Sequence, residues 1–96
     1  MARRSGKVAT LLSNASATGS AVHWEGGDGF VTAEATWAGA TATLQVQSQN
    51  GTWIAVGTDT TFTANGAAGF TLGECQIRVA ISGGPPSAVY VYAQQM

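Results

Sequence analysis

Charged side chains are scarce in this chain of 96 residues. Asp, Glu, Lys and Arg together make up 9% of it, with a net charge of −1, whereas soluble domains average about 25% charged residues. Four Lys and Arg residues are too few for a nucleic-acid contact surface, which needs several cations on one face. The surface must therefore be built from neutral polar residues. It belongs either to a weakly soluble domain or to one whose surface is covered by partners.

Cysteine and histidine are each present only once. Cys75 alone excludes an internal disulfide, and with His23 as the single histidine a structural zinc site lacks both a second thiolate and a second imidazole. We interpret Cys75 as a small buried apolar residue. The sequence predicts no metal and no cofactor.

Long apolar runs are also missing. No stretch approaches the roughly 20 residues that span a bilayer, and no apolar run of signal-peptide length follows the initial Met-Ala-Arg-Arg. We therefore expect synthesis in the cytoplasm and no membrane partner.

The chain has no window with helical periodicity, but it has 13 glycines and several alternating segments. Glycines separate these segments as hairpin turns require. Turns are predicted at 17–19, 26–29, 50–51 and 83–86, and strands at 7–14, 20–25, 30–37, 41–48, 52–57, 75–81 and 88–93, with a further hairpin over 60–72.

Eight or nine short strands predict an all-β fold, a small antiparallel β-sandwich of jelly-roll or immunoglobulin-like topology. We expect one domain over 8–96, preceded by a basic arm over 1–7. In the last strand Val89 and Val91 share one face, and Tyr90 and Tyr92 share the other. A strand that is apolar on both sides is either central and covered or buried in an interface.

Candidate catalytic residues gather only in the segment "HWEGGDG", where His23, Glu25 and Asp28 lie close in sequence. The segment lacks a partner nucleophile, the regular oxygen ligands of a calcium loop, and the Lys-Ser/Thr of a phosphate loop. It is interpreted as a polar hairpin turn. The sequence predicts no enzyme and no small-molecule substrate.

Three tryptophans, Trp24, Trp37 and Trp53, are candidate aromatic anchors. They suit either a sugar-stacking platform or a core and a subunit interface. Their positions in the alternating pattern favour the core or an interface.

Three of the four basic residues, Arg3, Arg4 and Lys7, precede the first predicted strand. Chain ends fray unless something holds them. Our hypothesis is an arm pinned against a neighbouring chain, with Arg3 and Arg4 meeting carboxylates there. Together with Tyr90 and Tyr92, these residues form the predicted partner interface.

Over 36–93 the chain carries a glycine corner, a Thr/Gln strand, the hairpin "NGTWIAVG" and the strand "CQIRVAISGG" before "VYVYA". This pattern resembles small virion proteins of tailed bacteriophages, among them capsid cement or decoration proteins. The resemblance implies a β-fold, commonly trimeric, that clamps junctions between major capsid subunits. It transfers no individual binding residue.

The expected function is therefore that of a bacteriophage capsid cement protein, located on the capsid surface of the virion. Its expected partners are the major capsid protein and two further copies of itself in a homotrimer. The alternative is a carbohydrate- or receptor-binding β-module of a phage fibre or tail.

Overall fold

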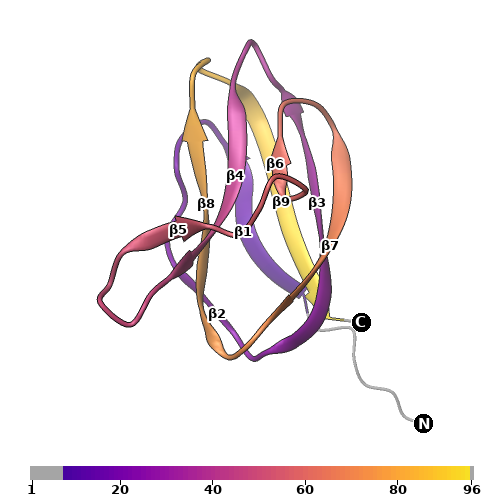
Figure 1. Ribbon diagram of the computed structural model, residues 1–96. Helices are drawn as coiled ribbons and strands as arrows, with labels where there is room; N and C mark the ends of the chain where they lie inside the picture. Colours follow the sequence, from indigo (N-terminus) through magenta and orange to yellow (C-terminus); the bar gives the residue numbers. More distant parts are fainter. Residues whose placement is uncertain (1–7, 96) are drawn as a thin grey trace, which may run out of the picture.

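The computed structural model describes residues 8–95, and within them it contains nine strands and no helix (Figure 1). The predicted all-β fold is confirmed. The strands are β1 (Val8–Ala15), β2 (Val22–Trp24), β3 (Gly27–Thr36), β4 (Thr41–Gln47), β5 (Trp53–Ala55), β6 (Thr61–Phe62), β7 (Gly66–Leu72), β8 (Cys75–Ser82) and β9 (Ser87–Gln95).

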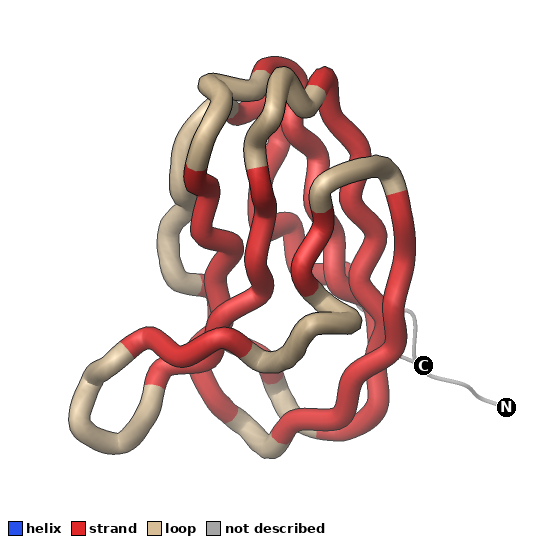
Figure 2. Tube along the Cα trace, turned by 45° about the horizontal axis from the view of Figure 1, so that its top comes forward, coloured by secondary structure: helices blue, strands red, loops and turns tan. Residues whose placement is uncertain are grey.

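The strands form two antiparallel sheets packed face to face (Figure 2). Sheet A has the order β1-β9-β3-β7. Sheet B has the order β2-β8-β4, and both β5 and β6 pair with the remaining edge of β4. β9 is thus a central strand, as one of the two predictions for it required, but its outer side is only half-buried.

The strand pairing is nested along the chain. β1 pairs with β9, β2 with β8, β3 with β7, and β4 with β5 and β6. A single antiparallel ribbon folded at β4–β5 and wrapped around the core gives this order, with β3–β9 and β4–β8 closing the two sheets. The topology is that of a jelly roll. In the immunoglobulin order the first strand would pair with the second.

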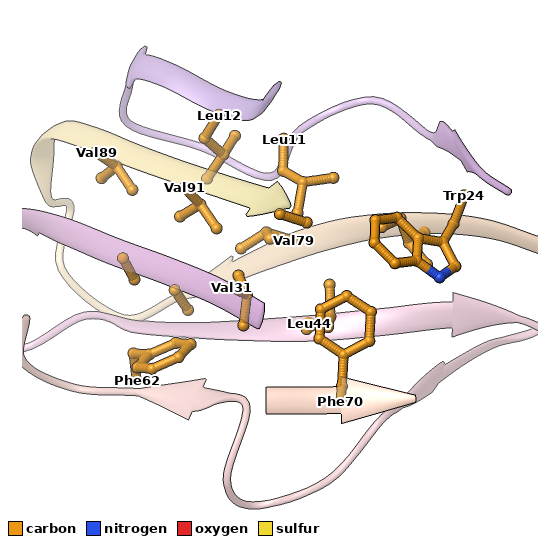
Figure 3. Close-up of a cluster of buried hydrophobic side chains, with 14 residues drawn as sticks. Leu11, Leu12, Trp24, Val31, Leu44, Phe62, Phe70, Val79, Val89 and Val91 are labelled. Atoms are coloured by element: carbon orange, nitrogen blue, oxygen red, sulfur yellow. The ribbon is translucent and has the colours of Figure 1, made fainter. Parts of the chain in front are cut away.

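The core lies between the sheets (Figure 3). Alternation places every second side chain inward, so β9 contributes Val89 and Val91, which are at most 1% exposed. Sheet B contributes Leu44, Ile77 and Val79, also at most 1% exposed. Each such side chain stabilises the fold by about 1.5–3 kcal/mol relative to its exposed state.

The turn predicted at 26–29 is wrong for all of its residues except Gly26. Gly27, Asp28 and Gly29 belong to β3 and pair with the end of β7. Gly29 is an inward position opposite Phe70, where a Cβ would come within 2.7 Å of the Trp24 ring. The glycine is therefore required by the packing of an indole over a strand and not by a turn.

The hairpin predicted over 60–72 is also wrong. β6 pairs with β4 in sheet B, whereas β7 pairs with β3 in sheet A, so the connection between them crosses from one sheet to the other. Phe62 and Phe70 both face the core and are 8% and 9% exposed. Phe62 and Phe70 face the same core from opposite sheets. Two strands with this arrangement have the same alternation of apolar residues as the two strands of a hairpin.

Candidate interaction surfaces

The outer face of sheet A carries the aromatic residues of β9 and β3. Because Val89 and Val91 point inward, Tyr90 and Tyr92 point outward and are half-buried. Register places Tyr90 opposite Glu34, Tyr92 opposite Thr32 and Thr10, and Gln94 opposite Phe30. We call this surface the tyrosine face; it is formed by Thr10, Phe30, Thr32, Glu34, Tyr90, Tyr92 and Gln94.

Phe30 was not singled out by the sequence analysis. It has the same parity in β3 as Thr32, which the alternating pattern assigns to the outer face, so the pattern contained the signal. Its cross-strand neighbour on the β7 side is Gly69, which leaves the ring half-buried. The tyrosine face therefore has three aromatic rings and a single carboxylate, that of Glu34.

The outer face of sheet B carries Trp53 on its edge strand β5. The Arg78 guanidinium carbon lies 4.5 Å from the centre of the Trp53 ring, and Arg78 Nε donates a hydrogen bond to Gln45 Oε1 at 2.8 Å. Gln47 is the cross-strand partner of Trp53. We call this surface the tryptophan face; it is formed by Gln45, Gln47, Trp53 and Arg78. Arg78 is the only Lys or Arg within residues 8–95.

The other two tryptophans have structural positions. Trp24 is 2% exposed and packs against Phe70 with ring centres 5.0 Å apart. Trp37 is half-buried against the core, and its Nε1 donates to Asn65 Oδ1 at 2.9 Å. The core position that the sequence analysis favoured for tryptophan is observed for Trp24, and neither ring offers a free flat platform.

The segment of His23, Glu25 and Asp28, interpreted as a polar hairpin turn, does not form a hairpin, because β2 belongs to sheet B and β3 to sheet A. His23 Nε2 lies 3.0 Å from Glu74 Oε2, and Glu74 was not connected with it by the sequence analysis. Asp28 lies in sheet A, where Thr71 Oγ1 donates to its Oδ1 at 2.6 Å. The pairing of β2 with β8 brings Glu74 to His23, a long-range contact that sequence spacing does not reveal.

A depression of about 240 Å³ lies beside His23 and is lined by Val8, Ala9, Val22, His23, Trp24, Glu25 and Gln95. Among the residues that the structure describes, neither Asp28 nor a serine, threonine or cysteine lines this depression. Within the described part of the chain, no group of three or more His, Cys, Asp or Glu could hold a metal ion. Residues 8–95 contain no helix that is long and apolar enough to cross a membrane.

Cys75 is half-buried and packs against the core, and burial raises the pKa of its thiol. Its environment is apolar, as expected for a small core residue, although it is not fully enclosed. Arg3, Arg4 and Lys7, the predicted interface residues of the arm, lie outside the described residues.

No protein-family model matches the chain, and the search of curated proteins also returns no match. The function must therefore be argued from the surfaces themselves. The two outer faces offer aromatic rings, neutral amides and hydroxyls, which are groups suited to contact with protein or sugar.

Proposed function

We propose that this chain is a bacteriophage capsid cement protein that binds across major capsid protein subunits and stabilises the shell as a homotrimer. The observation that carries the proposal is the tyrosine face, where Phe30, Tyr90 and Tyr92 lie on one sheet surface. Glu34 is the only charged residue among the seven that form this face, and Asp28 lies beyond Phe30 at the start of β3. Interfaces are enriched in aromatic residues and depleted of charges at their centre.

Dehydration supports this choice of surface. Removing ions from water costs far more than removing hydroxyl and amide groups, which can find new hydrogen-bond partners in the interface. Covering the tyrosine face therefore loses little solvation energy, while its rings gain contacts. A standard stable interface covers about 800 Å² on each partner, and the molecule measures 41 × 33 × 20 Å, which is flat enough to present such an area.

The proposed mechanism is mechanical. Each copy contributes one footprint, and three linked footprints dissociate far more slowly than one, because the remaining contacts hold a released copy near its site. Jelly rolls occur in viral capsid and lectin domains alike, so the fold is compatible with this proposal but does not select it.

The test is sedimentation of the isolated protein, followed by mixing with purified capsids that lack their cement protein. We expect a trimer in solution, saturable binding to the shells, and a rise in the temperature at which the shells break. A protein that stays in the supernatant at every concentration would refute the capsid function.

The tryptophan face supports a second candidate, a carbohydrate- or receptor-binding module of a phage fibre or tail. Sugar sites combine a flat ring with nearby amides, and here Gln47 is the cross-strand neighbour of Trp53. Glycan-array binding that disappears in Trp53→Ala, and persists in Tyr92→Ser, would favour this candidate over capsid attachment.

A further inference from the structure

The two sheets have four edges, and three of these edges are poorly suited to pairing with another chain. β1 has two register shifts against β9, β2 has three residues, and the edge beside β4 is broken into β5 and β6 of three and two residues. Irregular and short edges protect a sheet from unwanted strand addition.

The fourth edge, β7, has none of these protections. All seven residues of Gly66–Leu72 pair with β3 without a register shift, and the strand contains neither proline nor a charged residue. It forms one border of the molecule in Figures 1 and 2. A regular, uncharged edge of this length presents backbone N–H and C=O groups that can pair with an added strand.

Two carboxylates flank the end of this edge. Asp28 accepts the hydroxyl hydrogen bond of Thr71 on the outer face of sheet A. Asp59 lies on the other side, in a depression of about 310 Å³ that also borders Gly69, Phe70 and Thr71. Among residues 8–95 neither carboxylate is part of an ion pair, and Arg78 lies on the outer face of sheet B.

We propose that residues 1–7 of a second copy add to the β7 edge as an extended strand, with their cations meeting Asp28 and Asp59. The sequence of this segment, MARRSGK, has three cations and no anion, so its charge complements the two carboxylates. The inference rests on the homotrimer of the proposed function and not on its contact with the capsid.

Alternation along an added strand matches the placement of the carboxylates. Arg3 and Lys7 would point to one face of the strand and Arg4 to the other. Asp28 lies on the outer face of sheet A, and Asp59 comes from the loop of the opposite sheet. One extended segment therefore offers a cation to each side of the edge.

Exchange between copies lets more of residues 1–7 pair with β7 than attachment within one copy does. β1 and β7 are separated by three strand spacings, or about 14 Å, and seven extended residues reach about 24 Å. Crossing the sheet within one copy would use about four residues and leave three for pairing. Donation to the next copy leaves all seven available. Head-to-tail contacts of this kind close into a ring when the rotation between copies closes, as it does in a trimer.

The first test is charge reversal in the full-length chain, measured by sedimentation velocity over a range of concentrations. We expect Arg3→Glu/Arg4→Glu/Lys7→Glu to raise the concentration of half-assembly at least tenfold, because like charges then face each other. Asp28→Lys/Asp59→Lys should do the same. A chain that carries all five reversals should assemble like the wild type, which loss of folding could not produce.

Ser16→Lys/Gln49→Lys/Glu74→Lys is the matched control, since it changes the net charge equally at exposed residues outside the β7 edge and outside the tyrosine face. It should leave assembly unchanged. Equal weakening by this control, or no rescue in the combined variant, would overturn the proposal.

The second test locates the segment by disulfide trapping in a Cys75→Ala background. Ser5→Cys/Gly69→Cys should give covalent ladders of more than one chain on a denaturing gel, as exchange between copies requires. A cross-linked monomer would show attachment within one copy, and no cross-link would show that the segment does not reach β7; either result overturns the proposal. Capsid binding is scored separately, so a trimer that ignores capsids refutes the proposed function alone.

Discussion

The guanidinium of Arg78 is stacked over the ring of Trp53, with 4.5 Å between its carbon and the ring centre. The same side chain donates to Gln45, so it bridges from β8 across β4 to β5. The only Lys or Arg of residues 8–95 is thereby held against a neutral sheet surface. This arrangement limits the freedom of the charge and joins the short strand β5 to the body of sheet B.

We predict a coupling of about 0.5–1 kcal/mol between these two side chains, as expected of a cation–π contact at a partly exposed site. The measurement is a double-mutant cycle of Arg78→Gln and Trp53→Leu, followed by urea unfolding. Gln47→Ala combined with Arg78→Gln is the control pair. Additive effects in the first cycle would show that the stacked geometry contributes nothing to stability.

Gly29→Ala should lower the free energy of unfolding by about 1–3 kcal/mol, the usual range for overpacking a core. The added Cβ would come within 2.7 Å of the buried Trp24 ring and 2.8 Å of the Gln94 carbonyl oxygen. Gly69→Ala is the matched control in the neighbouring strand, since the nearest atom to its Cβ lies at 3.7 Å. Equal stability of the two variants would contradict this account of the core.

Asn65→Ala should destabilise the protein more than Trp37→Phe. The Asn65 Oδ1 atom accepts hydrogen bonds from Ala35 N at 3.1 Å and from Trp37 Nε1 at 2.9 Å. Loss of both is expected to cost about 1–3 kcal/mol, and loss of the indole bond alone about 0.5–1.5 kcal/mol. Thermal unfolding of the two variants gives the order, and the reverse order would show that Asn65 is not the organising residue of this corner.

The half-buried thiol of Cys75 should react slowly with iodoacetamide, and its reaction profile should be shifted to higher pH than that of a cysteine peptide. Burial raises the pKa of this thiol by disfavouring the thiolate. Its contribution to stability is therefore complete at low pH, and it is lost as the pH rises above the ordinary pKa of the thiol. The free energy of unfolding, measured with urea, should fall as the pH rises across this range. In Cys75→Ala it should depend less on pH. A pH dependence unchanged in Cys75→Ala would assign it to other groups.

Tyr90→Ser/Tyr92→Ser should reduce capsid occupancy at least tenfold if the tyrosine face is the footprint, because the loss of aromatic anchors dominates interface energies. Occupancy is measured by pelleting capsids with bound protein. Trp53→Ala, on the opposite outer face, should bind like the wild type. Weak binding of Trp53→Ala together with normal binding of Tyr90→Ser/Tyr92→Ser would show that the tryptophan face contacts the capsid.

Alternation alone predicted much of the sandwich. The strand at 41–48 and the strand that contains Val89 and Val91 were predicted correctly. One face of each strand is buried, so apolar residues recur at every second position of the sequence. The same parity predicted that Tyr90 and Tyr92 share a face, which register against β1 and β3 then places on the outside of sheet A.

Contacts between distant segments could not be predicted in this way. The partner of His23 is Glu74, 51 residues away, and the apparent hairpin of Phe62 and Phe70 is divided between the two sheets. Local sequence specifies which residues face inward, but not which sheet receives them, since Phe has the same burial preference in either. The choice between the two sandwich topologies likewise depends on pairing between the chain ends.

The nesting of β1 with β9 has a consequence for synthesis on the ribosome. β9 (Ser87–Gln95), the last strand of the described residues, lies in the middle of sheet A and separates β1 from β3. Until that strand emerges, the nascent chain has no complete sheet A and leaves the apolar side chains of β1 and β3 exposed. Sheet A therefore cannot be completed before β9 is available, and a chain truncated before Ser87 should yield an aggregating product and not a shortened domain.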